Sequence, residues 1–521
     1  MRFNFKLITI NLIALFLFTA CSTTSENTKK LFLQAQQGHE RSQFILGHMY
    51  DEGEEVDQDF KEAVKWYRLA AEQGSAVAQN NLGVKYQKGQ GVGQNDQEAV
   101  KWYRQAAKKG YVHAQYNLGY MYDIGKGVEQ DYKEAMKWYR LAAEKGSEQA
   151  QYNLAILYHY GRGVEQDEQK EEKWQRLSAE QGYAQAQHHL GFMYVTGKVV
   201  GQDYKEAVTW FRLSAEQGYA NAQASLGLMY QYGWGVGEDY QEAMKWTRLA
   251  ADQGYMKAQH NLGYMYDIGK GVEQDYKEAV KWYRLAADQG YLDAQHNLGY
   301  MYDIGKGVEQ DYKEAVKWYR LAAEQGYADA QYNLGNMYSH GRGVEQDDHE
   351  AVKWYRLAAE QGLAWAQINL GSAYHHGRGA EQDDQEAVKW YRLAAEQGYA
   401  GAQYTLGNMY LNGWGTEQDD QEAAKWYRLA AEQGFARAKV NLGHMYKHGR
   451  GIEKDYKEAV KWYRLAAEQG VSKAQVNLAW MYASGRGLPK SNFNGYMWLF
   501  LAKQEGLNKE AKAEFDKLTK I

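Results

Sequence analysis

Histidines are the side chains in this chain whose type and recurrence could support chemistry. An imidazole ring can ligate a metal ion or transfer a proton near neutral pH. His260 and His296 lie 36 residues apart, at equivalent places of a repeated pattern. Packed helices lie about 8–10 Å apart, so these two side chains, on neighbouring repeats, would be too distant to share one metal ion. We therefore expect neither a metal site nor a cofactor.

The chain also lacks the short motifs of common hydrolases. It contains no S-x-x-K, K-T-G, G-x-S-x-G or H-E-x-x-H segment. Loops such as Gly233-Trp234-Gly235 follow an expected helix end, where the helix dipole is negative and repels phosphate. The formal net charge is −5, and no basic cluster is present that could neutralise a nucleic acid. These observations predict a protein that is not an enzyme and that does not bind nucleic acid.

A strict tryptophan period indicates the fold that would position any functional side chain. An indole recurs every 36 residues without insertion or deletion, and a fixed period of this length is typical of a solenoid. The repeats run from 39–74 to 471–506, and each is expected to contact only its neighbours. The tryptophans in this register are Trp66, Trp102, Trp138, Trp174, Trp210, Trp246, Trp282, Trp318, Trp354, Trp390, Trp426, Trp462 and Trp498.

Residues 291–326 illustrate the first half of one repeat. Ala294, Leu298 and Met301 fall on one face of an expected helix from about 292 to 304. Two glycines follow this helix and turn the chain, as glycine commonly does after a helix C-terminus. The chain contains 54 glycines and one proline, which fits helices joined by glycine turns.

The second helix of the same repeat is expected to begin at Asp311. The Asp311 side chain can cap free backbone N–H groups, and Glu314 completes a capping-box-like pair. Ala315 and Trp318 belong to the buried stripe of this helix, whereas Arg320 is expected to face water. Each repeat is therefore predicted to be a helix–turn–helix unit in which small alanines lie beside a large indole.

A glycine in the middle of the first helix requires a separate explanation. Glycine costs about 1 kcal/mol relative to alanine in a helix interior. Gly299 nevertheless has an equivalent glycine in every repeat except two, where Ala155 and Ala479 stand. We expect the gain to come from the close approach of a neighbouring helix backbone.

The pattern A-x-x-x-L-G-x-M-Y-x-x-G-x-G-V-x-x-D-x-x-x-A-x-x-W-Y-x-x-A-A-x-x-G resembles the Sel-1-like repeat family, an α/α relative of the tetratricopeptide repeats. The resemblance covers residues 39–506. It implies an all-α fold, an α/α superhelical solenoid of about thirteen 36-residue repeats that acts as an adaptor or scaffold for other proteins. Some cysteine-rich members are associated with β-lactam binding or hydrolysis, but this chain has a single cysteine, so a β-lactamase-like hydrolase is only a remote alternative.

The N-terminal segment resembles the signal of a bacterial lipoprotein. Residues 1–20 contain a short positive region and an apolar run too short to span a bilayer comfortably. The stretch Leu17-Phe18-Thr19-Ala20-Cys21 resembles a lipobox, so Cys21 is the expected lipidation site. We expect an outer-membrane lipoprotein facing the periplasm. The alternatives are a plain signal peptide or an uncleaved anchor, and a secreted or cell-surface protein.

Two further segments and one irregular repeat complete the expected organisation. Residues 21–38 are expected to form a tether and an N-terminal cap, and residues 507–521 a C-terminal capping helix. Glu171 and Glu172 replace the alanine and valine of other repeats. Carboxylates near the interior are costly, so we expect local loosening or a kink in the second helix there.

A second stripe on the first helices is the candidate binding surface. In tetratricopeptide-like solenoids the first helix lines the concave groove, and tyrosine offers both contact area and a polar tip. Two loop tryptophans replace the lysine or arginine of other repeats and are further candidates. For the stripe and the loop indoles alike, the alternative is packing within or between repeats. The candidate residues are Tyr116, Tyr120, His260, Tyr264, His296, Tyr300, Tyr332, Tyr404, Trp234 and Trp414.

These observations favour a non-catalytic scaffold at the bacterial cell envelope. Its expected partners are other envelope proteins, bound through the concave face, and the membrane, reached through an N-terminal lipid. A scaffold associated with peptidoglycan or another polysaccharide is the alternative, because aromatic grooves also stack sugars.

Overall fold

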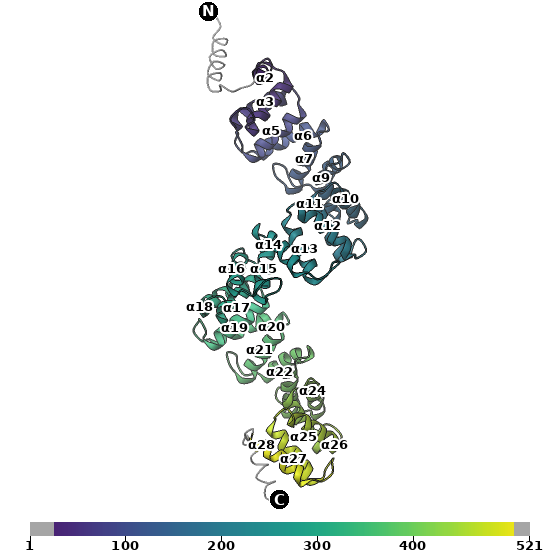
Figure 1. Ribbon diagram of the computed structural model, residues 1–521, viewed down its shortest axis with the longest axis vertical. Coiled ribbons are helices and arrows are strands. Elements are labelled where there is room, and N and C mark those ends of the chain that lie inside the picture. Colours follow the sequence, from purple (N-terminus) through teal and green to yellow (C-terminus); the bar gives the residue numbers. More distant parts are fainter. Residues whose placement is uncertain (1–25, 505–521) are drawn as a thin grey trace, which may run out of the picture. The chain divides into compact units, whose positions relative to one another are not determined.

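The computed structural model describes residues 26–504, and these residues form α-helices joined by short loops, with no strand. The chain divides into two compact units, Met1–Ala258 and Gln259–Ile521. Within each unit, helices that follow one another along the chain pack side by side, as Figure 1 shows. The fold is an all-α helical repeat solenoid, as predicted from the tryptophan period.

Each repeat contributes a first and a second helix. The first helices are α3 (Glu40–Glu52), α5 (Ala76–Lys88), α7 (Val112–Ile124), α9 (Glu148–Tyr160), α11 (Ala184–Thr196), α13 (Ala220–Tyr232), α15 (Met256–Ile268), α17 (Leu292–Ile304), α19 (Ala328–His340), α21 (Ala364–His376), α23 (Ala400–Asn412), α25 (Ala436–His448) and α27 (Ser472–Ser484). The second helices are α4 (Phe60–Glu72), α6 (Asp96–Lys108), α8 (Tyr132–Ala143), α10 (Glu168–Glu180), α12 (Tyr204–Glu216), α14 (Tyr240–Asp252), α16 (Tyr276–Asp288), α18 (Tyr312–Glu324), α20 (Asp348–Glu360), α22 (Asp384–Glu396), α24 (Asp420–Glu432), α26 (Tyr456–Ala467) and α28 (Asn492–Gln504).

The helix before the first repeat is α2 (Glu26–Gln36), which packs against α3. Helix α2 includes most residues of the expected N-terminal cap and the last residues of the expected tether. The signal at 1–20, Cys21 and the C-terminal cap at 507–521 lie outside the described residues. Within 26–504, no helix has the length and apolar character needed to cross a bilayer.

The ends of the helices confirm the expected caps, with one correction. The Asp311 carboxylate accepts hydrogen bonds from the N–H groups of Lys313 at 2.8 Å and Glu314 at 3.1 Å. Glu314 does not return the bond, because its carboxylate pairs with Lys317. The N–H of Asp311 instead donates to the carbonyl of Tyr302 at 3.0 Å. The predicted capping aspartate is therefore correct, and the predicted reciprocal bond is wrong.

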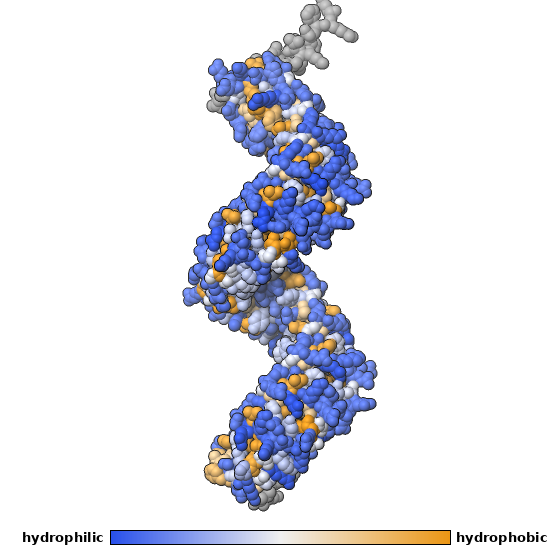
Figure 2. All heavy atoms as spheres, turned by 90° about the vertical axis from the view of Figure 1, so that its right-hand side faces the viewer, coloured by the Kyte–Doolittle hydropathy of each residue, from blue (hydrophilic) through white to orange (hydrophobic). Residues whose placement is uncertain are grey.

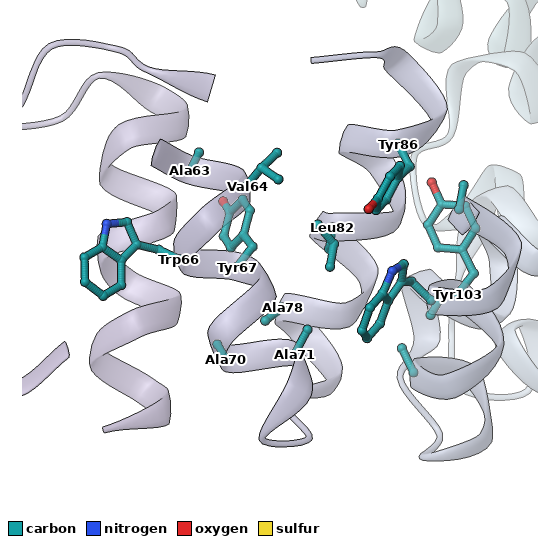
Figure 3. Close-up of a cluster of buried hydrophobic side chains, with 14 of the residues drawn as sticks. Ala63, Val64, Trp66, Tyr67, Ala70, Ala71, Ala78, Leu82, Tyr86 and Tyr103 are labelled. Atoms are coloured by element: carbon teal, nitrogen blue, oxygen red, sulfur yellow. The ribbon is translucent and has the colours of Figure 1, made fainter. Parts of the chain in front are cut away.

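The core follows the predicted pattern of small residues beside large ones. Ala315, Leu298 and Trp318 are buried in the repeat 291–326, and their equivalents are buried or half-buried elsewhere. Figure 3 shows the arrangement near the start of the array, where Ala70 and Ala71 of α4 lie close to Ala78 of α5. Small side chains allow the helices to approach, and the rings fill the space beside them.

The recurring glycine of the first helix faces an aromatic ring in most repeats, although Gly227 faces Thr247. A Cβ atom added at Gly299 would lie 2.8 Å from Cδ1 of Tyr319 and 3.3 Å from the carbonyl oxygen of Ala315. The expected backbone approach is thus present, but the ring comes closer. The two exceptions agree with this explanation: the position of Tyr319 holds Gln175 in the repeat with Ala155 and Leu499 in the repeat with Ala479.

A second glycine places most loops against the preceding repeat; Glu55 and Val199 stand at this position in two of them. Gly307 has φ +73°, in the left-handed region that favours glycine. A Cβ atom there would lie 2.1 Å from the carbonyl oxygen of Tyr276, the first residue of α16. The loop backbone therefore rests directly on the start of the second helix of the preceding repeat.

Side-chain hydrogen bonds join successive repeats at regular positions. The Arg320 guanidinium donates to the Tyr338 hydroxyl of the next repeat at 2.6 Å, so Arg320 does not simply face water as expected. Gln331 donates to the carbonyl of Ala323 in the preceding repeat at 3.1 Å and accepts from Gln361 of its own repeat at 2.7 Å. Because these bonds recur along the array, each repeat is fixed against the next by polar as well as apolar contacts.

The irregular second helix α10 is a continuous α-helix of 13 residues, and the expected local loosening or kink within it stays a prediction. Glu171 is 2% exposed and its carboxylate lies 2.9 Å from Nδ1 of His159. Burial raises the pKa of the Glu171 carboxyl, and the hydrogen bond to His159 offsets part of this shift. Glu172 pairs instead with Arg176 at 2.7 Å. The two carboxylates are accommodated by partners, which the sequence pattern does not predict.

Candidate interaction surface on the first helices

The candidate stripe separates into a covered row and an exposed row, four residues apart on each first helix. In the covered row, the His296 ring lies 5.8 Å from the ring of Tyr319 and 5.5 Å from that of Tyr327, which precedes the next first helix. Tyr404 lies between Tyr427 and Phe435 in the same way. The members of this row among the candidates are Tyr116, His260, His296, Tyr332 and Tyr404. Their rings pack within and between repeats, which was the alternative left open.

Burial also determines the charge of the covered histidines. It lowers the pKa of both His260 and His296, so both rings are neutral at pH 7. Asn333 hydrogen-bonds Nε2 of His296 at 2.9 Å, and Asn297 hydrogen-bonds Nε2 of His260 at 3.0 Å. The covered histidines therefore act as hydrogen-bonded spacers between repeats. Within residues 26–504, no three His, Cys, Asp or Glu side chains come together as a metal site.

The exposed row presents tyrosine rings to solvent. Tyr120, Tyr264 and Tyr300 are 38%, 40% and 47% exposed. Tyr264 and Tyr300 belong to adjacent repeats of the second unit. The helix that carries Tyr300 is packed within its repeat and against the next one through His296, which contacts the rings of Tyr319 and Tyr327. On the face seen in Figure 2, exposed apolar side chains form small separate patches among hydrophilic ones.

The acidic residues near this row have a structural partner. The hydroxyl of Tyr283 donates to Asp267 at 3.3 Å, and that of Tyr319 donates to Asp303 at 3.5 Å. Burial raises the pKa of both aspartates. These carboxylates therefore support the buried tyrosines of the second helices.

The two loop tryptophans occupy a slot between repeats and remain partly exposed. The Trp234 indole stacks on Tyr232 with ring centroids 4.9 Å apart and on Tyr204 at 5.8 Å. In another repeat the same slot holds Arg162, which lies over the equivalent tyrosines. Trp414 packs against His375 at 5.3 Å. Packing against neighbouring rings thus accounts for part of the surface of each indole, and each remains 42% exposed.

Sequence reasoning missed two exposed features. Trp365 on α21 is 53% exposed, and its ring lies edge-on to Tyr399. Trp365 could have been found from the sequence, because it is a tryptophan outside the 36-residue register. The leucine of the R-L-A-A segment of the second helices is also partly exposed, as at Leu285 and Leu321. This leucine recurs in nearly every repeat and could have been found from the sequence.

The comparisons with known proteins agree with this architecture. A family model described as Sel1 repeat matches thirteen consecutive segments, which are 41–75, 76–111, 112–147, 148–183, 184–219, 220–255, 257–291, 292–327, 328–363, 366–399, 400–435, 436–471 and 472–507. No curated protein is similar enough to count as a relative.

The solved structures that are similar to this chain include two repeat proteins. One is a protective antigen of uropathogenic Escherichia coli strains that displays an SLR fold, with 37% sequence identity over 87% of this chain and 93% of that chain, and a TM-score of 0.67. The other is a Sel1 repeat protein from Oxalobacter formigenes, with 37% identity over 59% of this chain and 90% of that chain, and a TM-score of 0.49.

Proposed function

Because this chain belongs to the Sel1 repeat family, whose members generally mediate protein–protein interactions without catalysis, we propose that it is a non-catalytic scaffold that binds a protein of the bacterial cell envelope. The binding surface is the exposed tyrosine row of the first helices. The observation that carries this proposal is the repetition of an exposed ring, Tyr264 and then Tyr300, at one position of consecutive repeats.

Tyrosine at these positions is suited to recognition of a protein. A phenol ring supplies apolar contact area, its hydroxyl can exchange hydrogen bonds, and few torsions are lost on binding. Binding energy at interfaces is concentrated in a few such residues. Because the covered row holds the helices in place, the exposed rings are already arranged before a partner arrives, which lowers the entropic cost of association.

Alanine substitution of the exposed tyrosines tests this surface. Tyr264→Ala and Tyr300→Ala are each expected to weaken capture of a stoichiometric protein partner from envelope extract by about tenfold, a loss typical of an interface anchor. The control variants are Leu285→Ala and Leu321→Ala, because these leucines are similarly exposed but lie on the second helices. Loss of the partner with the leucine variants and not with the tyrosine variants would place binding on the other helix face.

A polysaccharide-associated scaffold is the second candidate. It is favoured by Trp234, whose indole stacks on two tyrosines and leaves part of its surface in solvent. Aromatic faces of this kind can stack on sugar rings. Retention of the full chain on purified peptidoglycan, with no stoichiometric protein in the pull-down, would favour this candidate over the first.

We also propose that the protein is anchored through a lipid on Cys21, in the outer membrane and facing the periplasm. The support is the lipobox-like segment that ends at Cys21, and the description of the similar E. coli protein as a protective antigen is in keeping with an envelope location. Two or more acyl chains are needed for stable anchoring.

Inhibition of lipoprotein processing tests the anchor. Globomycin treatment is expected to accumulate an unprocessed precursor, and Cys21→Ser is expected to release the protein from the membrane fraction. Ser22→Ala, next to the proposed lipidation site, is the control and should stay membrane-bound. If globomycin leaves the mobility and the membrane fraction unchanged, the protein is not a lipoprotein.

A further inference from the structure

The last helix of the described residues, α28, presents an apolar face to solvent. It packs against α27 at the C-terminal end of the array (Figure 1). Phe493 is 74% exposed and Tyr496 is 68% exposed. Five large side chains of α28 are exposed at spacings of three and four residues, so they share one face of the helix. We call this set the α28 row, and its members are Phe493, Tyr496, Met497, Phe500 and Leu501.

Three members of the α28 row stand where the preceding repeat has cations. Each lies 36 residues after a lysine or arginine of α26. Exposed apolar patches commonly mark interaction sites, and here the apolar side chains replace charges that would keep the helix face in water. The replaced residues of α26 are Lys457, Lys461 and Arg464, and their counterparts in α28 are Phe493, Met497 and Phe500.

A further repeat stacked after α28 in the usual way would not cover these three side chains. The helix α26 has such a neighbour, since α27 of the next repeat packs against it. The contact uses another side of α26, where Val460 and Ala467 share a buried cluster with Leu478 of α27. The three cations of α26 remain exposed beside it. The apolar side chains at the same positions of α28 therefore need a different occupant.

The order of side chains in the α28 row is symmetric. Phe493 and Phe500 are equally far along the chain from the midpoint between Tyr496 and Met497. In a two-fold symmetric pair the same surface of both copies meets, so every contact between two different residues occurs twice. Two α28 helices packed antiparallel would place Phe493 against Phe500 of the second copy. Tyr496 would then contact Met497 of the second copy beside the two-fold axis.

The exposed area of the α28 row is also the size that a dimer needs. A fully exposed side chain of this size presents about 200 Å², so the exposed fractions of the row correspond to about 500 Å² per copy. A symmetric pair would remove about 1,000 Å² from water in total, which is the lower limit for a specific interface. Symmetry and area thus both fit a second copy of the chain.

We propose that α28 is a dimerisation helix, through which two copies of this chain pair by their α28 rows in an antiparallel arrangement. The proposal goes beyond the scaffold function and does not use the tyrosine row of the first helices. A dimer formed at α28 carries two such tyrosine rows. A partner with two binding sites of its own would therefore be held at both.

Cysteine crosslinking of the full chain in intact cells tests the dimer. Met497→Cys places a thiol beside the two-fold axis, and a short bismaleimide should convert it to a dimer-sized band. Lys461→Cys, at the same position of the preceding repeat, is the matched control and should give no such band. The parent chain measures any crosslinking through Cys21, its single cysteine. A missing band for Met497→Cys, or an equal band for Lys461→Cys, would overturn the proposal.

Second substitutions in the Met497→Cys chain show whether the α28 row holds the dimer. Phe493→Lys and Phe500→Arg copy the residues at the same positions of α26, so both are expected to fold. Each should reduce the crosslinked fraction at least about tenfold, a loss typical of an interface anchor. Leu465→Lys, at a 39% exposed leucine of α26, should leave the fraction unchanged. An unchanged fraction in both α28 variants would refute the pairing.

Two results would replace the second copy by another occupant, and either would overturn the proposal. In the first, the full chain gives no dimer, and α28 is protected from hydrogen exchange only while residues 505–521 are present. In the second, the full chain gives no dimer and sediments with lipid vesicles unless it carries Phe493→Lys.

Discussion

Gly307→Ala is expected to destabilise the array around its own loop by about 3 kcal/mol. Two effects add: alanine is strained at φ +73°, and its Cβ atom would lie 2.1 Å from the backbone carbonyl of Tyr276, which has no rotamer through which to move away. Solenoid stability is a sum over repeats and their interfaces, so the loss should be local. Native-state hydrogen exchange should show faster exchange in α16, α17 and α18 than in distant helices.

Two other glycines separate these effects. Gly326 has φ +92° and no atom within 4 Å of the place that a Cβ atom would take, so Gly326→Ala measures strain alone and should cost about 1–2 kcal/mol. Gly93 has open space and no positive φ, so Gly93→Ala should be close to neutral. If Gly307→Ala costs no more than Gly326→Ala, the contact of the loop with the preceding repeat contributes nothing to stability.

Gly299→Ala is the second substitution with a large expected effect. Its Cβ atom would lie 2.8 Å from the Tyr319 ring, so the ring must shift in a close-packed core at a cost of about 1–3 kcal/mol. Tyr319→Leu alone should also destabilise, because it leaves a cavity. The double variant recreates the natural pair Ala479 and Leu499. We expect it to cost at least about 1 kcal/mol less than the sum of the single changes.

Denaturant unfolding together with hydrogen exchange over α17 and α18 measures this double-mutant cycle. Ala479→Gly is the control, because Leu499 leaves no ring to accommodate and the change should show only the helix cost of glycine, about 1 kcal/mol. Additive effects of Gly299→Ala and Tyr319→Leu would mean that glycine is retained for the Ala315 carbonyl and not for the ring.

The parts of the fold that depend on neighbours in the chain could be predicted. Trp318 and Ala315 share one face of a helix by spacing alone, and Asp311 caps the N–H groups two and three residues ahead. Contacts across repeats could not be predicted this way. A period shows that Gly299 has an equivalent in nearly every repeat, but it does not show which side chain of the next helix fills the space above it.

The candidate surface was predicted only in part for a related reason. His296 and Tyr300 are four residues apart and therefore share a helix face. The next repeat covers His296 and leaves Tyr300 exposed. This difference depends on how the helices pack against one another, which the spacing of the residues does not show.

The glutamine bonds between repeats make most junctions interchangeable. Each of these repeats carries the donor, such as Gln331, and its acceptor is a backbone carbonyl of the preceding repeat, such as that of Ala323. The array could thus lengthen or shorten by whole units through recombination within the identical stretches 263–286 and 299–322, without leaving a polar group unmatched. Lys439 replaces this glutamine in one repeat, and there Gln469 of the same repeat donates across the junction to the carbonyl of Gly434. That junction therefore differs from those at which a glutamine reaches the preceding repeat.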